Sequence, residues 1–186
     1  MPFMSSIIYN LREKGLKKPE NPRWINYCYL LLKVPILCRM AKYVIYRYLH
    51  LPNSVNLLKG FYCSSNLLEV GEHTGLGNLH VIAWAKVTIG NNCSFSFDNK
   101  IITSTHDFDD FRKVIATPVT IGDNVWITSN VTILPGVTIG SNTVIGAGSV
   151  VTKNIQGGVF AAGNPCRVIR KINFKIEVND NEKSLQ

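Results

Sequence analysis

A single apolar residue returns at every sixth position through the C-terminal half of the chain, with a small or β-branched residue two places before it. The apolar positions are Ile121, Ile127, Ile133, Ile139, Ile145 and Val151, and the residues two places before them are Val119, Val125, Val131, Val137, Thr143 and Ser149. An α-helix repeats at about 3.6 residues and a β-strand at about 2, so neither accounts for a period of six. The pattern therefore predicts a solenoid wound from short strands and turns.

The same step runs less regularly through the preceding residues. Val70-Gly71, Leu76-Gly77 and Ile82 keep it, and it slips by one residue before Ile89-Gly90. In such a coil each unit forms one side of a triangular prism, the apolar residue points inward, and Gly or Asn turns the corner. Successive turns stack as parallel strands roughly 4.8 Å apart. The sequence thus predicts a mainly β fold, with a parallel β-helix over residues 61–172.

The period fails between Ile101 and Ile121, which stand twenty residues apart, three units with two residues left over. The stretch TSTHDFDDFRKVIATP shows no repeat, so we expect residues 102–118 to form an excursion from the prism. A compact solenoid wall offers little concavity, and loops that leave one edge are where a site would be built. After the β-helix, residues 173–186 are polar and are expected to form a C-terminal tail.

Residues 1–60 differ from the rest in charge. They hold 10 Lys and Arg against 2 Asp and Glu, whereas residues 61–186 hold 10 of each class, so the whole formal net charge of +8 lies in this third. Because the repeat carries none of the excess, no nucleic-acid partner is expected.

Residues 24–51 are rich in aromatic and aliphatic side chains and carry Lys33, Arg39, Lys42 and Arg47 at intervals, so a membrane-spanning helix is not expected. Two interpretations remain open. In the first, amphipathic helices broken near Pro35 cap the open end of the solenoid and pack between subunits. In the second, their basic and aromatic face also rests on the inner membrane surface, where Lys and Arg meet anionic headgroups and Trp and Tyr lie at the interface.

The cysteines are odd in number and widely spaced, with no C-x-x-C pair or zinc spacing: Cys28, Cys38, Cys63, Cys93 and Cys166. The opening residues MPFMSSIIYNLREKG do not have the pattern of an export signal. We therefore expect reduced thiols, no bound metal and a cytoplasmic protein, either free or peripheral at the inner membrane.

Among the four histidines, only His106 lies in the excursion, where Asp107 follows it. An imidazole titrates near neutrality and can take a proton from a hydroxyl or amine that attacks a carbonyl group. His73 and His80 occupy repeat positions and are expected to serve packing or the surface. His106 is therefore the candidate general base.

The segment from Val119 to Ile172, VTIGDNVWITSNVTILPGVTIGSNTVIGAGSVVTKNIQGGVFAAGNPCRVIRKI, closely resembles the C-terminal half of the hexapeptide-repeat acetyltransferases. The resemblance is greatest to the maltose and galactoside O-acetyltransferase branch. Upstream, VTIG at residues 87–90 followed by His106 reproduces the family's spacing between this tetrapeptide and its catalytic histidine. The resemblance covers roughly residues 67–172.

The resemblance implies a left-handed parallel β-helix, a homotrimer, and acetyl-CoA bound in the groove between neighbouring prisms. His106 would remove the proton from an acceptor hydroxyl as the oxygen attacks the thioester directly in a ternary complex, and a backbone amide near Ser129 would stabilise the oxyanion. The implied cofactor site has an aromatic side chain beside the pantetheine arm, basic residues at the phosphates and small residues where the cofactor approaches the backbone: Trp126; Lys153, Arg167 and Arg170; and Gly146, Ala147, Ala161 and Ala162.

Two residues are assigned to the acceptor. Asn78 stands at the same distance before VTIG as an acceptor-site asparagine of the galactoside branch. Asp107 replaces the family's usual proline and either orients the imidazole or points elsewhere. Thr128 is a further departure, because the family usually has glycine there. No maltose-type N-terminal domain is recognisable in residues 1–60, which are instead similar to those of O-acetyltransferases that modify glycans or lipid-linked sugars.

These features together predict an acetyl-CoA-dependent O-acetyltransferase that acts on a sugar hydroxyl in surface polysaccharide synthesis, of capsule or O-antigen. One alternative is N-acetylation of an amino sugar, which uses the same fold and a similar base. Another is a non-catalytic β-solenoid scaffold, which would need neither the excursion nor the basic segment AAGNPCRVIRK.

Overall fold

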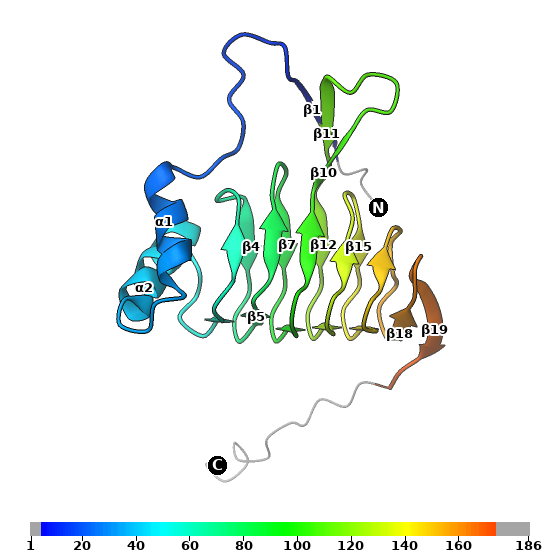
Figure 1. The fold of residues 1–186 in the computed structure, drawn as a ribbon. Helices are drawn as coiled ribbons and strands as arrows, with labels where there is room; N and C mark the ends of the chain where they lie inside the picture. Colours follow the sequence, from blue (N-terminus) through cyan, green and yellow to red (C-terminus); the bar gives the residue numbers. More distant parts are fainter. Residues whose placement is uncertain (1–4, 174–186) are drawn as a thin grey trace, which may run out of the picture.

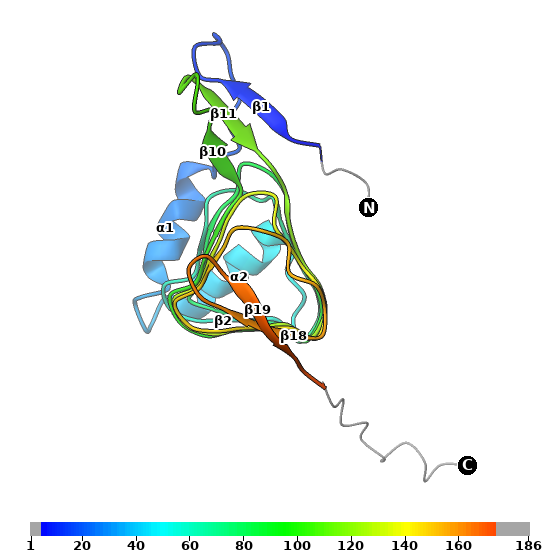
Figure 2. The ribbon, with the colours of Figure 1, turned by 90° about the vertical axis from the view of Figure 1, so that its right-hand side faces the viewer.

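Residues 5–173 are described by the computed structural model, and their central part is a parallel β-helix with a triangular cross-section (Figures 1 and 2). The chain passes repeatedly through three sheets, here numbered in chain order. Sheet 1 contains β2 (Asn56–Leu57), β5 (Gly75–Gly77), β8 (Ser94–Phe95), β13 (Trp126–Ile127), β16 (Val144–Ile145), β18 (Val159–Ala162) and β19 (Arg167–Lys171). Sheet 2 contains β3 (Tyr62–Cys63), β6 (His80–Ile82), β9 (Lys100–Ile102), β14 (Thr132–Ile133) and β17 (Val150–Val151). Sheet 3 contains β4 (Leu68–Val70), β7 (Val87–Ile89), β12 (Val119–Ile121) and β15 (Thr138–Ile139).

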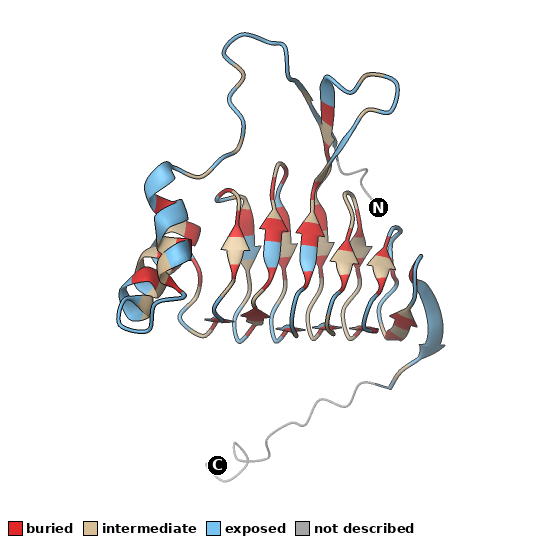
Figure 3. Cartoon of the chain, viewed as in Figure 1, coloured by how far each residue is buried: buried red, intermediate tan, exposed pale blue. Residues whose placement is uncertain are grey.

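The strand register confirms the six-residue unit. Ile121 pairs with Ile139 and Ile127 pairs with Ile145, so equivalent residues of stacked turns are three units apart. The apolar residues of the repeat are fully or almost fully buried and line the inside of the prism, as the red segments of Figure 3 show. Their removal from water is the main stabilising contribution to the fold. The predicted mainly β, parallel β-helix is therefore confirmed.

Glycine and asparagine turn the edge between sheets 3 and 1. Asn124 and Asn142 have φ values of 55° and 58°, in the left-handed region that asparagine tolerates better than most residues. His73 occupies the same corner two turns nearer the N-terminus than Asn124, with φ of 56°, so its position has a structural explanation. A Cβ atom on Gly122 would lie 2.7 Å from the backbone nitrogen of Ser141 in the next turn. The close stacking of turns therefore requires glycine at this corner.

The excursion leaves the prism at the edge between sheets 2 and 3. Ile89 pairs with Ile121, which lies 32 residues later, whereas a regular turn such as Ile121 to Ile139 takes 18. Ile101 and Ile121 are thus one unit apart in the prism, with the excess residues looped out between them. No further turn of the prism lies in this interval, where the sequence shows no repeat.

Two helices cover the N-terminal end of the prism (Figure 1). They are α1 (Arg23–Leu31) and α2 (Cys38–Leu49). Ile25 and Ile45 are fully buried and belong to the same apolar core as the β-helix, so the helices close the end that stacked strands would leave open. No helix within residues 5–173 is both long enough and apolar enough to cross a bilayer.

The N-terminal residues also contain a strand. β1 (Ile7–Asn10) pairs antiparallel with β11 (Lys113–Ala116), which pairs antiparallel with β10 (Ser104–His106), so the excursion is part of a small three-stranded sheet (Figure 2). The Tyr9 hydroxyl donates to the backbone oxygen of Trp84 at 3.1 Å. Thus residues 1–60, expected to be a helical segment, also support the excursion, and the first β-helix strand, β2, begins before residue 61. Residues 174–186 of the expected tail lie outside the described residues.

Candidate active site

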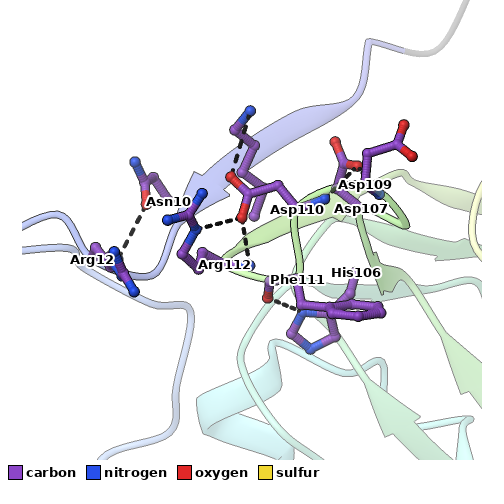
Figure 4. A network of polar contacts seen from close by, with 9 residues as sticks. Asn10, Arg12, His106, Asp107, Asp109, Asp110, Phe111 and Arg112 are labelled. Atoms are coloured by element: carbon purple, nitrogen blue, oxygen red, sulfur yellow. Dashed lines mark hydrogen bonds and ion pairs between the residues drawn. The ribbon is translucent and has the colours of Figure 1, made fainter.

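His106 ends strand β10, where the backbone pairing with β11 fixes its position. Its Nδ1 atom lies 2.7 Å from the backbone oxygen of Phe111, and the two rings pack edge to face with centroids 6.5 Å apart (Figure 4). A carbonyl oxygen only accepts hydrogen bonds, so Nδ1 is the protonated nitrogen. The imidazole side chain is exposed, and the neutral ring has its lone pair on Nε2. The tautomer is therefore the one that a general base requires.

Asp107 does not orient this imidazole. Its Oδ1 atom accepts hydrogen bonds from the backbone nitrogens of Asp109 at 2.9 Å and Asp110 at 3.2 Å, which closes the turn of the excursion (Figure 4). Of the two roles considered from the sequence, the carboxylate thus points elsewhere. Arg112 Nε donates to Asp110 Oδ1 in the same loop, and this hydrogen bond holds the pKa of the Asp110 carboxyl below its ordinary value.

The predicted site residues lie on different edges of the prism. His106 and Lys153 follow strands of sheet 2 and lie at the edge between sheets 2 and 3. Asn78, Ser129 and Ala147 follow strands of sheet 1 and lie at the edge between sheets 1 and 2. One chain therefore does not bring the candidate base together with the candidate oxyanion and acceptor groups.

Sheet 1 does bring an aromatic and a basic candidate into one row. Trp126 pairs with Val144, Val144 with Phe160, and Phe160 with Arg170. Trp126 is 50% exposed, and its Nε1 atom donates to Ser96 Oγ at 3.3 Å. The Arg170 guanidinium lies 6.0 Å from the centre of the Phe160 ring. Side chains that share a row on the outer face of a sheet form a continuous surface, here ending at the C-terminal end of the prism.

The remaining candidates of the cofactor site differ in exposure. Arg167 and Lys153 are exposed, and Arg167 Nη1 donates to the backbone oxygen of Cys166. Ala161 is fully buried, whereas Ala162 is partly exposed. A Cβ atom on Gly146 would lie 2.8 Å from the Ala162 Cβ atom, which gives this glycine a packing reason of its own.

The edge between sheets 1 and 2 has a polar hollow of about 170 Å³ that includes Asn78. Its lining residues are Gly60, Asn78, His80, Asp98, Asn99 and Lys100. Asn78 Nδ2 donates to Asp98 Oδ1 at 2.8 Å, and the Asp98 backbone nitrogen donates to Asn78 Oδ1 at 2.7 Å. Sequence reasoning missed Asp98 and Lys100, although both follow Asn78 and His80 by about one turn of the repeat. It also missed the Phe111 carbonyl, because a backbone contact across a loop has no sequence signal.

Neither a disulfide nor a metal cluster occurs among the described residues. All the cysteines are free thiols, and residues 5–173 contain no group of three or more His, Cys, Asp or Glu side chains that is arranged to hold a metal ion.

Comparison with known proteins identifies the class to which this fold and site belong. Residues 118–153 match the family described as bacterial transferase hexapeptide (six repeats). The galactoside O-acetyltransferase of Escherichia coli (strain K12) is 42% identical over 125 residues, which are 65% of this chain and 56% of that protein. The crystal structure of a maltose O-acetyltransferase from Clostridium difficile 630 has a TM-score of 0.71 and 33% identity, covering 83% of this chain and 91% of that chain. A galactoside acetyltransferase in complex with coenzyme A has a TM-score of 0.64 and 31% identity, covering 82% and 84%.

The chain therefore belongs to the hexapeptide-repeat acetyltransferases, whose fold is a left-handed parallel β-helix. The predicted family, fold class and enzyme class, an acyltransferase, are confirmed at the level of the family. The chain spans 56% of the length of the curated relative from Escherichia coli.

Proposed function

We propose that this protein transfers an acetyl group from acetyl-CoA to a hydroxyl group of a sugar, with His106 as the general base. The observation that carries the proposal is the hydrogen bond between His106 Nδ1 and the Phe111 carbonyl oxygen. It leaves Nε2 of the neutral ring as a proton acceptor on an exposed loop. The similarity to an acetyltransferase that binds coenzyme A supports the co-substrate, and the names of the relatives support a sugar acceptor.

The reaction proceeds by direct transfer. His106 Nε2 takes the proton of the acceptor hydroxyl while the oxygen forms a bond to the thioester carbonyl carbon. The backbone amide near Ser129 donates a hydrogen bond to the resulting oxyanion. When the carbon–sulfur bond breaks, the imidazolium returns the proton to the sulfur of CoA. No acyl-enzyme forms, and holding both substrates in one complex supplies much of the rate.

The complete site requires more than one subunit. His106 and Lys153 lie at one edge of the prism, whereas Asn78 and Ser129 lie at another, next to the row of sheet 1 that begins at Trp126. In a homotrimer of prisms packed side by side, the edge of one subunit that carries His106 can face the edge of its neighbour that carries Asn78. The groove between them would hold acetyl-CoA, with Lys153, Arg167 and Arg170 at its phosphates and Asn78 and Asp107 towards the acceptor.

The role of His106 is tested by separating binding from transfer. A ligand at 100 times its Kd stabilises the folded state by about 2.7 kcal/mol, a shift of several degrees in Tm, so CoA should raise the Tm of the wild type and of His106→Ala alike. His106→Ala should lower the rate of transfer by about 10²–10⁴-fold. His73→Asn is the matched control, because asparagine suits its left-handed corner, and it should keep full activity. Turnover by His106→Ala at the wild-type rate would remove His106 from the base role.

The shared site is tested by mixing two inactive variants. In a trimer made only of His106→Ala chains, or only of Asn78→Ala chains, every active site lacks one of the two residues. In trimers assembled from equal amounts of both chains, about one site in four receives both intact residues. Recovery of about a quarter of the wild-type activity in co-expressed protein is expected, and no recovery would exclude a site made by two subunits in this way.

The acceptor is identified with labelled acetyl-CoA and a panel of oligosaccharides, nucleotide sugars and undecaprenyl-linked sugars. We propose a glycan of surface polysaccharide, capsule or O-antigen, on the basis of the basic and aromatic N-terminal residues. Double-reciprocal plots should intersect, as for a ternary complex, whereas an acetyl-enzyme would give the parallel lines of ping-pong kinetics. Label that appears only on amino sugars would instead establish N-acetylation.

A further inference from the structure

The outer face of α2 is apolar and basic, and it does not pack against the β-helix. Ala41, Ile45 and Leu49 form the buried face of α2 against the core. On the opposite side of the helix, and in the turn that precedes it, large apolar side chains are exposed: Ile36 at 89%, Met40 at 70% and Tyr43 at 70%. Basic side chains stand beside them, of which Arg39 and Arg47 are exposed and Lys42 is partly buried. We call this set, with Arg39, Lys42 and Arg47, the end face, because α2 covers the N-terminal end of the prism (Figures 1 and 3).

The end face carries one sign of charge. The sequence has no Asp or Glu between Glu20 and Glu69, so no acidic residue lies in α1, in α2 or in the turn between them. The ion pairs within residues 5–173 join Lys86 to Glu69 and bring Arg112 and Lys113 to Asp110, so none of them neutralises a cation of α2.

The end face also has hollows beside its cations. One, of about 340 Å³, is lined by Arg39, Met40, Tyr43 and Val44. Another, of about 290 Å³, lies beside Arg47 and His50 and shares Tyr43 with the first. Each hollow thus combines an aromatic wall with a guanidinium group, which suits an anionic headgroup above an apolar chain.

We propose that the end face docks the protein on an anionic lipid bilayer, with Ile36 and Met40 entering the interface and Arg39, Lys42 and Arg47 at the lipid phosphates. Basic side chains flanking exposed apolar and aromatic ones are the combination that binds such a surface. A second copy of the same face is a poorer occupant. Two end faces placed together would bring like charges together, with no acidic residue on either side to pair with them.

Docking in this orientation keeps the candidate site away from the lipid. His106 follows β9, the third strand of sheet 2 from this end. Two strand spacings amount to roughly 10 Å, and the helix layer adds about 10 Å more. The end face would therefore concentrate the protein at a membrane while leaving His106 well above the headgroups. The inference is independent of the acetyl acceptor.

The test is flotation of the full chain with vesicles of phosphatidylcholine alone or with about 30% phosphatidylglycerol, at about 0.05 M and 0.5 M NaCl. Binding is expected only with the anionic lipid and should weaken in high salt. Each cation near such a surface strengthens partitioning by about fivefold, so Arg39→Gln/Lys42→Gln should bind about 25-fold more weakly. Lys14→Gln/Lys17→Gln removes the same charge from the exposed loop before α1 and should stay within about twofold of the wild type.

A second pair of substitutions tests the apolar contribution. Ile36→Ser/Met40→Ser alters exposed side chains and should keep the fold but weaken binding at least about tenfold. Equal binding by this variant and the wild type would refute insertion, and absent binding to anionic vesicles in low salt would refute docking altogether. Sedimentation without lipid provides a further outcome. If the wild-type assembly doubles in mass and the Ile36→Ser/Met40→Ser assembly does not, the end face binds a second copy of itself and the proposal of lipid docking is overturned. Acetyl transfer to a soluble acceptor should be unchanged in these variants. The experiment therefore distinguishes a failure of the docking proposal from a failure of the proposed catalytic function.

Discussion

Replacing Gly122 by alanine tests whether stacking of turns is what requires glycine at the edge between sheets 3 and 1. Neither Gly122 nor Gly75 has a left-handed backbone, so the backbone conformation at both positions is one that alanine readily adopts. At Gly122 the new Cβ atom would lie 2.7 Å from the backbone nitrogen and 3.1 Å from the Cα atom of Ser141. At Gly75, in β5, a Cβ atom would meet nothing within 4 Å. The two substitutions therefore differ only in the packing between turns.

The expected cost follows from the distances. Ordinary contact begins at 3.4 Å, so the next turn must move by about 0.7 Å. Such a shift stretches the hydrogen bonds from Gly122 N to Ile139 O, now 2.8 Å, and from Asp123 N to Ser141 Oγ, now 3.0 Å, to the limit of bonding or beyond it. Two weakened hydrogen bonds at about 0.5–1.5 kcal/mol each, together with about 1–3 kcal/mol of overpacking, give a loss of about 2–6 kcal/mol.

The assay is thermal unfolding of both variants, followed by circular dichroism at one fixed protein concentration, because assembly makes Tm depend on concentration. Gly122→Ala should lower Tm by roughly 4–24 °C, at about 2–4 °C for each kcal/mol. Gly75→Ala should leave stability unchanged or raise it by about 0.4–1 kcal/mol, because alanine restricts the unfolded chain. Equal stability of Gly122→Ala and the wild type, or equal losses for both variants, would refute the stacking argument.

Three further predictions concern other parts of the fold. Burial raises the pKa of the Cys63 thiol to about 12 from an ordinary 9.0, so its contribution to stability is complete below pH 9 and is lost as pH rises towards 12. Between about pH 8 and pH 10 urea titrations should show the wild type losing about 1.4 kcal/mol more than Cys63→Val, and equal losses would contradict this cause. Tyr9→Phe removes the hydrogen bond to the Trp84 oxygen and should cost about 1 kcal/mol, seen as faster amide exchange in β1 and β11; unchanged exchange would mean that the bond does not hold β1. Asn124→Gly and Asn124→Ala both remove the hydrogen bond from Asn124 Nδ2 to Asn142 Oδ1, but at φ of 55° the alanine variant should be about 1–2 kcal/mol less stable than the glycine variant in thermal unfolding; equal stability of the two would show that this corner is not strained.

The sequence predicted the repeat and the candidate base because both depend on local order. Residues at a spacing of six face the same interior whichever turn they belong to, so Ile121, Ile127 and Ile133 identified the prism without any distant contact. His106 stood out because the period stops around it.

Other features depended on residues far apart in the chain. The pairing of β1 with β11 joins Ile7 to Ala116, and no local sequence pattern in either segment predicts this pairing. Likewise, the tautomer of His106 is set by the backbone of Phe111 across the loop, not by the adjacent Asp107.

By itself, the sequence determined the cross-section of this protein: an apolar residue every six positions, with glycine and asparagine at one edge, folds into a triangular coil. Only the tertiary structure decided which edge each site residue occupies. Asn78 and Ser129 belong to the same edge although the excursion lies between them in the chain, because the looped-out residues shift the place of later strands in the turn by an amount that only strand pairing reveals. The structure also decided which face of α2 remains uncovered, because burial depends on what packs against a helix and not on the helix alone.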